Sequence, residues 1–258
     1  MYKKIIFEKE DAVARIVFNR PEAMNSLDME TLLELEKALD DCEMDDGIGA
    51  VIITGTGKAF CAGADLKYQL NVIAGSLSKE REFIGHVRKV TDLISGLSKP
   101  VIAAINGFAL AGGFEILMAC DLAIAADGVK IGDQHMNYAL LPGAGSSQRL
   151  PWIVGMRRAK EILFTGKWLT AVEAEQLGIV NKVVPADNLE AAAMEMAANL
   201  ASKSRLSLKE MKRLVNNVPE MGLKAGIDIE SQACVMLVAN EDAHKGIDAF
   251  NVKGKKKA

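Results

Sequence analysis

A glutamate and two adjacent glycines share one apolar stretch of the sequence, which runs from Asn106 to Asp121 as NGFALAGGFEILMACD. Gly112 and Gly113 let the backbone approach another molecule closely, because glycine has no Cβ atom. The first N–H groups of a helix lack internal partners and carry the positive end of its dipole. A helix that begins at these glycines would therefore offer hydrogen-bond donors to a developing oxyanion.

Glu115 follows Gly112 by three residues, so on a helix its carboxylate projects near the face where the first N–H points. A capping box would need Ser or Thr at position 112, where glycine stands. The apolar residues that follow leave little polar face for a solvated glutamate. We interpret Glu115 as an acid or base that shares a pocket with the oxyanion donor. A buried structural carboxylate is the alternative.

A second loop of small residues runs from Phe60 to Leu66 as FCAGADL, with Asp65 at an expected helix start. The backbone N–H of Ala62 is a candidate second donor to the same oxyanion. Taken alone, the loop is explained equally well as a tight turn into a helix.

Two other glycine-containing segments do not match nucleotide-binding motifs. The segment 55–58 lacks the first glycine of a P-loop, and Ala59 stands where that motif needs Ser or Thr. The Gly143 and Gly145 pair lacks the third glycine of a dinucleotide fingerprint. Neither segment therefore predicts a nucleotide site.

The elements that must position these residues are predicted as parallel strands and helices. Apolar runs at 101–105 and 122–126 flank the central stretch and indicate two buried parallel strands. The runs at 5–7 and 13–18 predict a hairpin, and 50–54 predicts another buried strand. Helices are expected from a cap at Ser26 or Asp28, between residues 66 and 97, at 156–164 and 171–177, and through the chain after Pro185.

Composition limits the class of protein. The chain has 258 residues, of which 50% are hydrophobic and 5% aromatic, so it can bury a large core that suits α/β packing better than a β-sandwich. The net charge is −3 with both signs mixed along the chain, which argues against nucleic-acid binding.

The sequence also predicts a cytoplasmic protein. The four cysteines at positions 42, 61, 120 and 234 show no metal-site spacing and indicate free thiols in a reducing compartment. We expect no signal peptide and no membrane span, because no apolar run is long enough.

Four ordered segments together resemble the enoyl-CoA hydratase/isomerase family, the crotonase superfamily: 60–66, 106–115, 141–150 and 166–181. The resemblance implies an α/β fold in which residues 1–200 form a spiral of ββα turns around a roughly perpendicular two-sheet core. Residues 201–258 would form a C-terminal α-helical region that drives assembly into a trimer, or into a hexamer of two trimers. The implied partner is an acyl-CoA thioester; coenzyme A is part of that substrate, and no separate cofactor or metal is expected.

The resemblance also assigns site residues. It places the thioester oxygen between the N–H groups of Ala62 and Gly112, and it places the loop 62–66 (Ala62, Gly63, Ala64, Asp65 and Leu66) along the CoA arm. It implies that Phe250 packs against CoA and that Lys253 reaches its phosphates. The next basic residue of that pattern is Gly254 here.

His135 is a departure from the family pattern. Family hydratases use two glutamates; Glu115 matches the first, and His135 stands where the second is expected, seven residues before Pro142. Because histidine titrates near neutrality, His135 is a candidate for moving the second proton. Asp133 is a candidate for orienting its ring, and a residue that only fills the pocket is the alternative.

We therefore expect hydration of an α,β-unsaturated acyl-CoA, or the reverse dehydration, with Glu115 as general acid/base and His135 as its candidate partner. Double-bond isomerisation or thioester hydrolysis on the same fold is the first alternative. A non-catalytic acyl-CoA-binding protein is the second. The sequence does not specify the acyl group.

Overall fold

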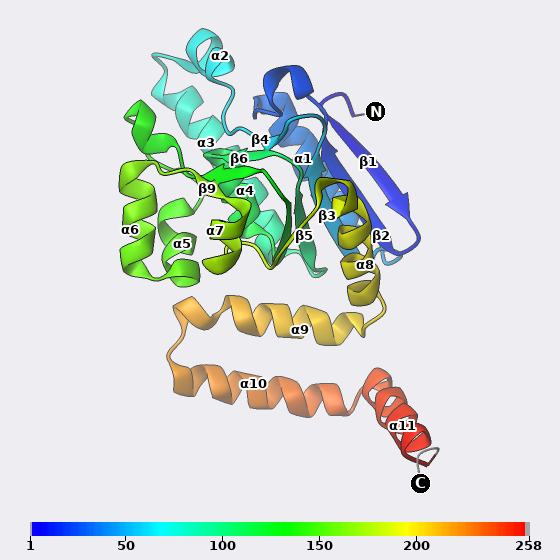
Figure 1. Cartoon of the computed structure of the whole chain (residues 1–258). Helices are drawn as coiled ribbons and strands as arrows, with labels where there is room; N and C mark the ends of the chain where they lie inside the picture. Colours follow the sequence, from blue (N-terminus) through cyan, green and yellow to red (C-terminus); the bar gives the residue numbers. More distant parts are fainter. Residues whose placement is uncertain (1, 256–258) are drawn as a thin grey trace. The chain divides into compact units, whose positions relative to one another are not determined.

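The computed structural model describes residues 2–255, and it describes side chains up to residue 248 (Figure 1). The chain divides into two compact units, Met1–Ala201 and Ser202–Ala258. Each unit has its own architecture, and the first contains the elements that carry Glu115 and His135.

The first unit is built on a six-stranded sheet in the order β1-β2-β3-β5-β7-β10. Its first two strands form the predicted antiparallel hairpin, and the remaining neighbours pair in parallel. The predicted parallel pair at 101–105 and 122–126 is confirmed as β5 and β7. The strands are β1 (Ile5–Glu10), β2 (Val13–Phe18), β3 (Ala50–Gly55), β5 (Val101–Ile105), β7 (Leu122–Ala126) and β10 (Lys182–Val184).

A second sheet of four short strands has the order β4-β6-β8-β9. These strands are β4 (Ala59–Cys61), β6 (Phe108–Leu110), β8 (Lys130–Gly132) and β9 (Leu169–Thr170). The sequence did not predict them as strands, because two or three residues are too few to show a strand pattern.

Three successive turns of the chain repeat one path, which confirms the expected ββα spiral. Each turn contributes one strand to the six-stranded sheet and the next strand to the four-stranded sheet, and then continues into helix. The pairs β3–β4, β5–β6 and β7–β8 are followed by α2 (Leu66–Tyr68) with α3 (Leu77–Gly96), by α4 (Gly112–Ala119) and by α5 (Ser146–Val154). Every turn therefore passes from one sheet to the other just before its helix begins.

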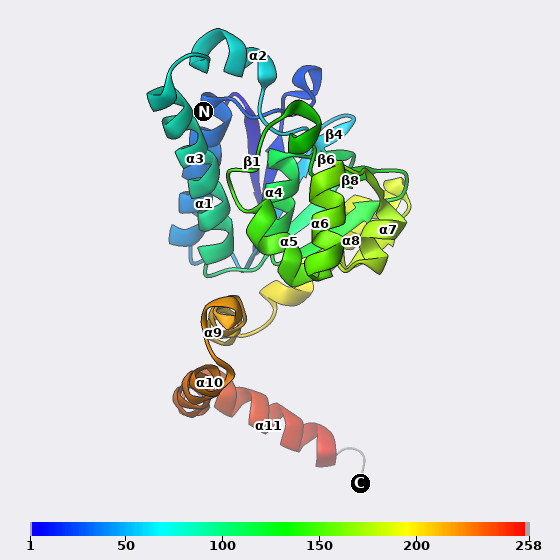
Figure 2. The same ribbon diagram turned by 90° about the vertical axis from the view of Figure 1, so that its left-hand side faces the viewer.

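Helices cover the sheets of the first unit (Figures 1 and 2). α1 (Met29–Met44) begins at Asp28, whose side chain accepts from the Thr31 N–H and confirms the predicted cap. α8 (Leu189–Ala201) packs on β2, β3, β5 and β7. α5 was not predicted, and Pro151 lies inside it, where proline is unfavourable. The remaining helical elements are η1 (Pro21–Ala23), the π-helical turn η2 (Gln69–Ile73), η3 (His135–Tyr138), α6 (Met156–Thr165), α7 (Ala171–Gln176) and η4 (Ala186–Asn188).

The second unit is helical, as the sequence predicted. It contains α9 (Arg205–Asn216), η5 (Val218–Glu220), α10 (Leu223–Val238) and α11 (Glu241–Lys255). α10 buries Ala233 and exposes large apolar side chains at positions 223, 227, 235, 236 and 238. Among residues 2–255, none of the helices combines the length and the apolar character that crossing a bilayer needs.

Candidate active site

Two loops approach each other backbone to backbone in the first unit. Gly63 has a positive φ of 95°, and a Cβ atom on it would lie 2.8 Å from the Ala111 Cβ and 3.0 Å from the Gly112 nitrogen. A Cβ atom on Gly113 would lie 2.0 Å from the Cys61 carbonyl oxygen. Glycine is therefore required at both positions, and this close approach brings the two sequence-predicted loops together.

The turn into α4 is strained. The helix begins at Gly112, as predicted. Its N-cap residue Ala111 has φ 48° and ψ −117°, a backbone conformation that residues other than glycine rarely adopt. Within residues 2–255, the Gly112 N–H donates to no acceptor. The turn thus leaves the first amide of the helix without a partner among the described residues and close to Gly63 of the neighbouring loop.

Ala62 is wrong as the second oxyanion donor, because its N–H is already used. It donates to the Met24 carbonyl at 3.1 Å. An amide held by a protein carbonyl would have to break that hydrogen bond before it could bind a thioester oxygen.

Ala64 has the available amide instead. It lies opposite Leu27 in a parallel bridge, in which Leu27 donates to the Gly63 carbonyl at 2.8 Å and Asp65 donates to the Leu27 carbonyl at 2.9 Å. Because successive amides of an extended segment point to opposite sides, the Ala64 N–H faces away from Leu27. It has no acceptor among the described residues, and a Cβ atom on Gly112 would lie 3.8 Å from its nitrogen. Ala64 and Gly112 therefore present the neighbouring unpaired amides.

Glu115 lies in α4 and is 2% exposed. Its Oε1 atom accepts from the Ala144 N–H at 2.7 Å and from the Ser146 N–H at 3.2 Å. Burial raises the pKa of this carboxyl, and the two backbone donors and His135 oppose the rise without cancelling it. The other oxygen, Oε2, accepts no hydrogen bond within the described part of the chain, so it is left for a water molecule or substrate.

His135 is held by Asp133, which is 1% exposed. The ring Nδ1 lies 2.9 Å from one Asp133 carboxylate oxygen and 3.1 Å from the other, and the His135 backbone N–H donates to the same carboxylate at 3.1 Å. An ionised carboxylate only accepts, so Nδ1 carries a proton and Nε2 is the atom that can exchange one. The suggested orienting role of Asp133 fits this geometry.

The charges of this pair favour the imidazolium. Burial lowers the pKa of His135, but the Asp133 hydrogen bond and charge, with a contribution from Glu115, outweigh burial and raise it above its ordinary value. Burial opposes the charge of Asp133, yet its bonds to His135 hold that pKa below the ordinary value. The Ser146 hydroxyl is buried beside Asp133 and makes no hydrogen bond of regular geometry there.

The structure describes the predicted CoA-binding residues Asp65 and Leu66 in full, but not the side chains of Phe250 and Lys253. Asp65 caps α2 by accepting from the Lys67 and Tyr68 N–H groups, and Leu66 is 48% exposed. Phe250 and Lys253 fall within α11, but their side chains lie outside the described residues. No group of three or more His, Cys, Asp or Glu among the described residues is arranged to hold a metal ion.

Sequence reasoning missed Ala144 and Ser146 as functional positions, and it placed Ala64 along the CoA arm without assigning its amide as an oxyanion donor. All three contribute through backbone amides, which every residue type carries, so their side chains gave no signal. Only the hydrogen-bond pattern distinguishes the Ala64 amide from that of Ala62.

Known proteins and a family model match almost the whole chain. The family model described as enoyl-CoA hydratase/isomerase matches residues 8–257. A crotonyl-CoA hydratase from Syntrophomonas wolfei is 40% identical, covering 98% of this chain and 97% of the relative. A short-chain-enoyl-CoA hydratase from Clostridium acetobutylicum is 38% identical, covering 97% and 95%.

A solved structure agrees with these relatives. The crystal structure of enoyl-CoA hydratase from Bacillus anthracis superposes with a TM-score of 0.93 at 37% sequence identity, covering 97% of each chain. Sequence and fold thus lead to one assignment, and the chain belongs to the enoyl-CoA hydratase/isomerase family.

Proposed function

We propose that this protein hydrates an α,β-unsaturated acyl-CoA thioester and catalyses the reverse dehydration, without a separate cofactor. The observation that carries the proposal is a buried Glu115 with one free carboxylate oxygen and a His135 ring held by the buried Asp133, on a fold that presents two unpaired amides. The relatives named as crotonyl-CoA and short-chain-enoyl-CoA hydratases support the same reaction.

The amides of Ala64 and Gly112 would receive the thioester carbonyl oxygen. Adding water across the double bond moves negative charge onto this oxygen as an enolate develops. Amides fixed in place before the reaction stabilise that charge without having to reorganise. The positive end of the α4 dipole contributes in the same direction.

Two proton transfers complete the addition. The water oxygen bonds to the β-carbon while Glu115 Oε2 takes one of its protons, and His135 Nε2 gives its proton to the α-carbon. The raised pKa of His135 keeps the ring protonated for the second transfer. Glu115 then returns its proton to the histidine, so the site is regenerated and the net change is the addition of one water molecule.

The Asp133–His135 pair replaces a carboxylic acid with an imidazolium whose positive charge is balanced by an adjacent carboxylate. The local charge sum therefore stays close to that of a neutral acid, while the proton donor is an imidazolium whose pKa the Asp133 carboxylate raises.

The test is an assay of purified protein with crotonyl-CoA in ¹⁸O-labelled water, with enoyl absorbance and product mass as readouts. Hydration adds one labelled water; isomerisation adds no mass, and thioester hydrolysis releases free CoA thiol. Glu115→Gln should abolish hydration and leave acyl-CoA affinity nearly unchanged, and His135→Gln should cost about two to four orders of magnitude in turnover. The exposed Glu22→Gln is the matched control. Activity in His135→Gln close to wild type would refute the proton-donor role.

We also propose that the protein assembles into a trimer or a hexamer. The apolar side chains that α10 exposes support this, because large apolar side chains gathered on one exposed helix often mark an interface. Cytoplasmic location and the CoA contacts of Phe250 and Lys253 stay predictions.

A further inference from the structure

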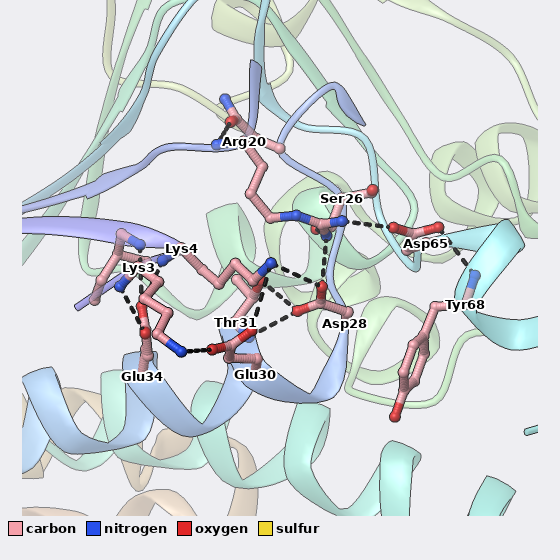
Figure 3. Close-up of polar contacts among 12 residues, drawn as sticks. Lys3, Lys4, Arg20, Ser26, Asp28, Glu30, Thr31, Glu34, Asp65 and Tyr68 are labelled. Carbon is pink, nitrogen blue, oxygen red and sulfur yellow. Dashed lines mark hydrogen bonds and ion pairs between the residues drawn. The ribbon is translucent and has the colours of Figure 1, made fainter. Parts of the chain in front are cut away.

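A nearly buried arginine ties the loop 62–65 to the turn that precedes α1 (Figure 3). The Arg20 side chain is 13% exposed. One guanidinium nitrogen lies 2.9 Å from Asp65, and the other lies 3.1 Å from Asp28 and donates to the Ser26 carbonyl at 2.6 Å. One planar group thus joins three segments, which are the end of β2, the cap of α1 and the cap of α2.

Backbone hydrogen bonds also join the loop 62–65 to residues 24–27. Met24 and Leu27 together accept the N–H groups of Ala62 and Asp65, and the Leu27 N–H donates to the Gly63 carbonyl. The register of these three hydrogen bonds places the Ala64 N–H on the side of the loop away from Leu27, near Gly112.

The turn at residues 24–27 contains backbone conformations that are locally unfavourable. Met24 and Asn25 are consecutive residues with φ of 54° and 55°, a conformation that costs free energy for residues other than glycine. Asn25 compensates by donating to the carbonyls of Thr56 and Ala59 at 2.9 and 2.7 Å, and its Oδ1 atom accepts from the Arg20 N–H at 2.8 Å. Arg20 therefore holds the turn through both its backbone and its side chain.

The two carboxylates suit a guanidinium better than an ammonium. Asp28 and Asp65 are 12% and 14% exposed, so both need a close cation. A planar fork reaches both at once, whereas the single Nζ of lysine reaches only one with good geometry. Burial opposes the charge of Asp65, but bonds from Tyr68 and Arg20 outweigh it and hold the pKa of Asp65 below its usual value.

We propose that Arg20 is a positioning residue for the reaction: by clamping Asp65 and the turn 24–28 it fixes the Ala64 N–H as an oxyanion donor. The inference rests on the proposed function for the identity of the ligand, a thioester carbonyl. Arg20 itself touches no reacting atom in this assignment and acts through the loop that it anchors.

The experiment compares Arg20→Met and Arg20→Lys with Lys4→Met. Lys4 is the matched control, because it lies in the same cluster and pairs with Asp28 and Glu30 but not with Asp65. We expect Arg20→Met to lower kcat by about ten- to a hundredfold with KM changed less than about threefold, because a displaced donor affects the transition state most. The kcat of Arg20→Lys should lie between those of Arg20→Met and wild type, and the kcat and KM of Lys4→Met should match those of wild type.

A second readout does not depend on turnover. Isotope-edited infrared spectra of bound butyryl-CoA, labelled with ¹³C at the carbonyl, report hydrogen bonding to that oxygen. The carbonyl band should move to lower frequency on binding wild type and Lys4→Met, and this shift should shrink in Arg20→Met. If Arg20→Met does not fold, Asp65→Asn gives the same test, because asparagine can still cap α2 while losing the charge that pairs with Arg20.

The outcomes separate the two proposals. Wild-type kcat and carbonyl shift in Arg20→Met would overturn the inference, as would equal losses in Lys4→Met or a wild-type protein without any carbonyl shift. A wild-type protein that shows the shift but does not hydrate enoyl-CoA would refute the proposed function, while loss of the shift in Arg20→Met would still support the positioning role.

Discussion

Replacing a single backbone amide by an ester tests which N–H groups bind the thioester oxygen. Lactic acid incorporated at position 64 by nonsense suppression exchanges the Ala64 N–H for an oxygen atom and keeps the methyl side chain. The same exchange at position 62 removes the amide that donates to Met24 at 3.1 Å. Each variant loses one N–H and has a weaker acceptor at the carbonyl of the same bond, so the pair compares the two N–H groups without a change in side-chain volume.

The structure predicts opposite effects for the two esters. Losing one oxyanion donor costs roughly 10²- to 10³-fold in kcat, which corresponds to about 2.7–4 kcal/mol of transition-state stabilisation. The ester at position 64 should show this loss with only a small loss of stability, because its N–H has no partner in the folded chain and the Gly63 carbonyl of the same bond, which accepts from Leu27, merely becomes a weaker acceptor. The ester at position 62 should lower the free energy of unfolding by about 1 kcal/mol and change kcat only a few-fold.

Steady-state kinetics with crotonyl-CoA, together with urea unfolding of each variant, measures both quantities. A large loss of kcat at position 62 with near wild-type kcat at position 64 would refute the assignment of Ala64. Equal losses at both positions would mean that the loop moves as a unit and that the parallel bridge with Leu27 does not separate the roles of the two amides.

Three further predictions concern pH, packing and assembly. Asp133 raises the pKa of His135, so activity that needs the imidazolium should fall as pH rises through that pKa. Asp133→Asn should move this alkaline limb of the kcat–pH profile to lower pH. An unmoved limb would contradict the role of Asp133 in holding the imidazolium. The same shift should stabilise the fold at pH values below the pKa of unfolded histidine, about 6.5, and this contribution should disappear as pH rises through the folded pKa. Gly113→Ala should lower the free energy of unfolding by about 3 kcal/mol or more, because its Cβ would lie 2.0 Å from the Cys61 oxygen. In the control Gly85→Ala the new Cβ has no atom within 4 Å, so this variant should be as stable as wild type or more stable. Chemical denaturation measures the stability of both variants. Light scattering should report a trimer or a hexamer at micromolar concentration, and a stable monomer would contradict the role given to the exposed apolar side chains of α10.

The sequence by itself determined the features that depend on neighbouring residues. Apolar runs predicted β3, β5 and β7. Helix starts were predicted at Ser26 or Asp28 and at Asp65, and Asp28 and Asp65 cap α1 and α2. The helix α4 begins at Gly112, as predicted. The position of Glu115 on the first turn of α4 follows from helical spacing alone. Family membership was likewise carried by local motifs in a fixed order.

Only the tertiary structure decided which backbone groups are available for chemistry. Ala62 and Ala64 are alike in side chain and loop, and the choice between them depends on hydrogen bonds to residues 24–27, far away in the sequence. The same holds for the amides of Ala144 and Ser146, which meet Glu115 because α5 packs on α4. Backbone amides are chemically identical along a chain, so their availability is set by which distant segment satisfies them.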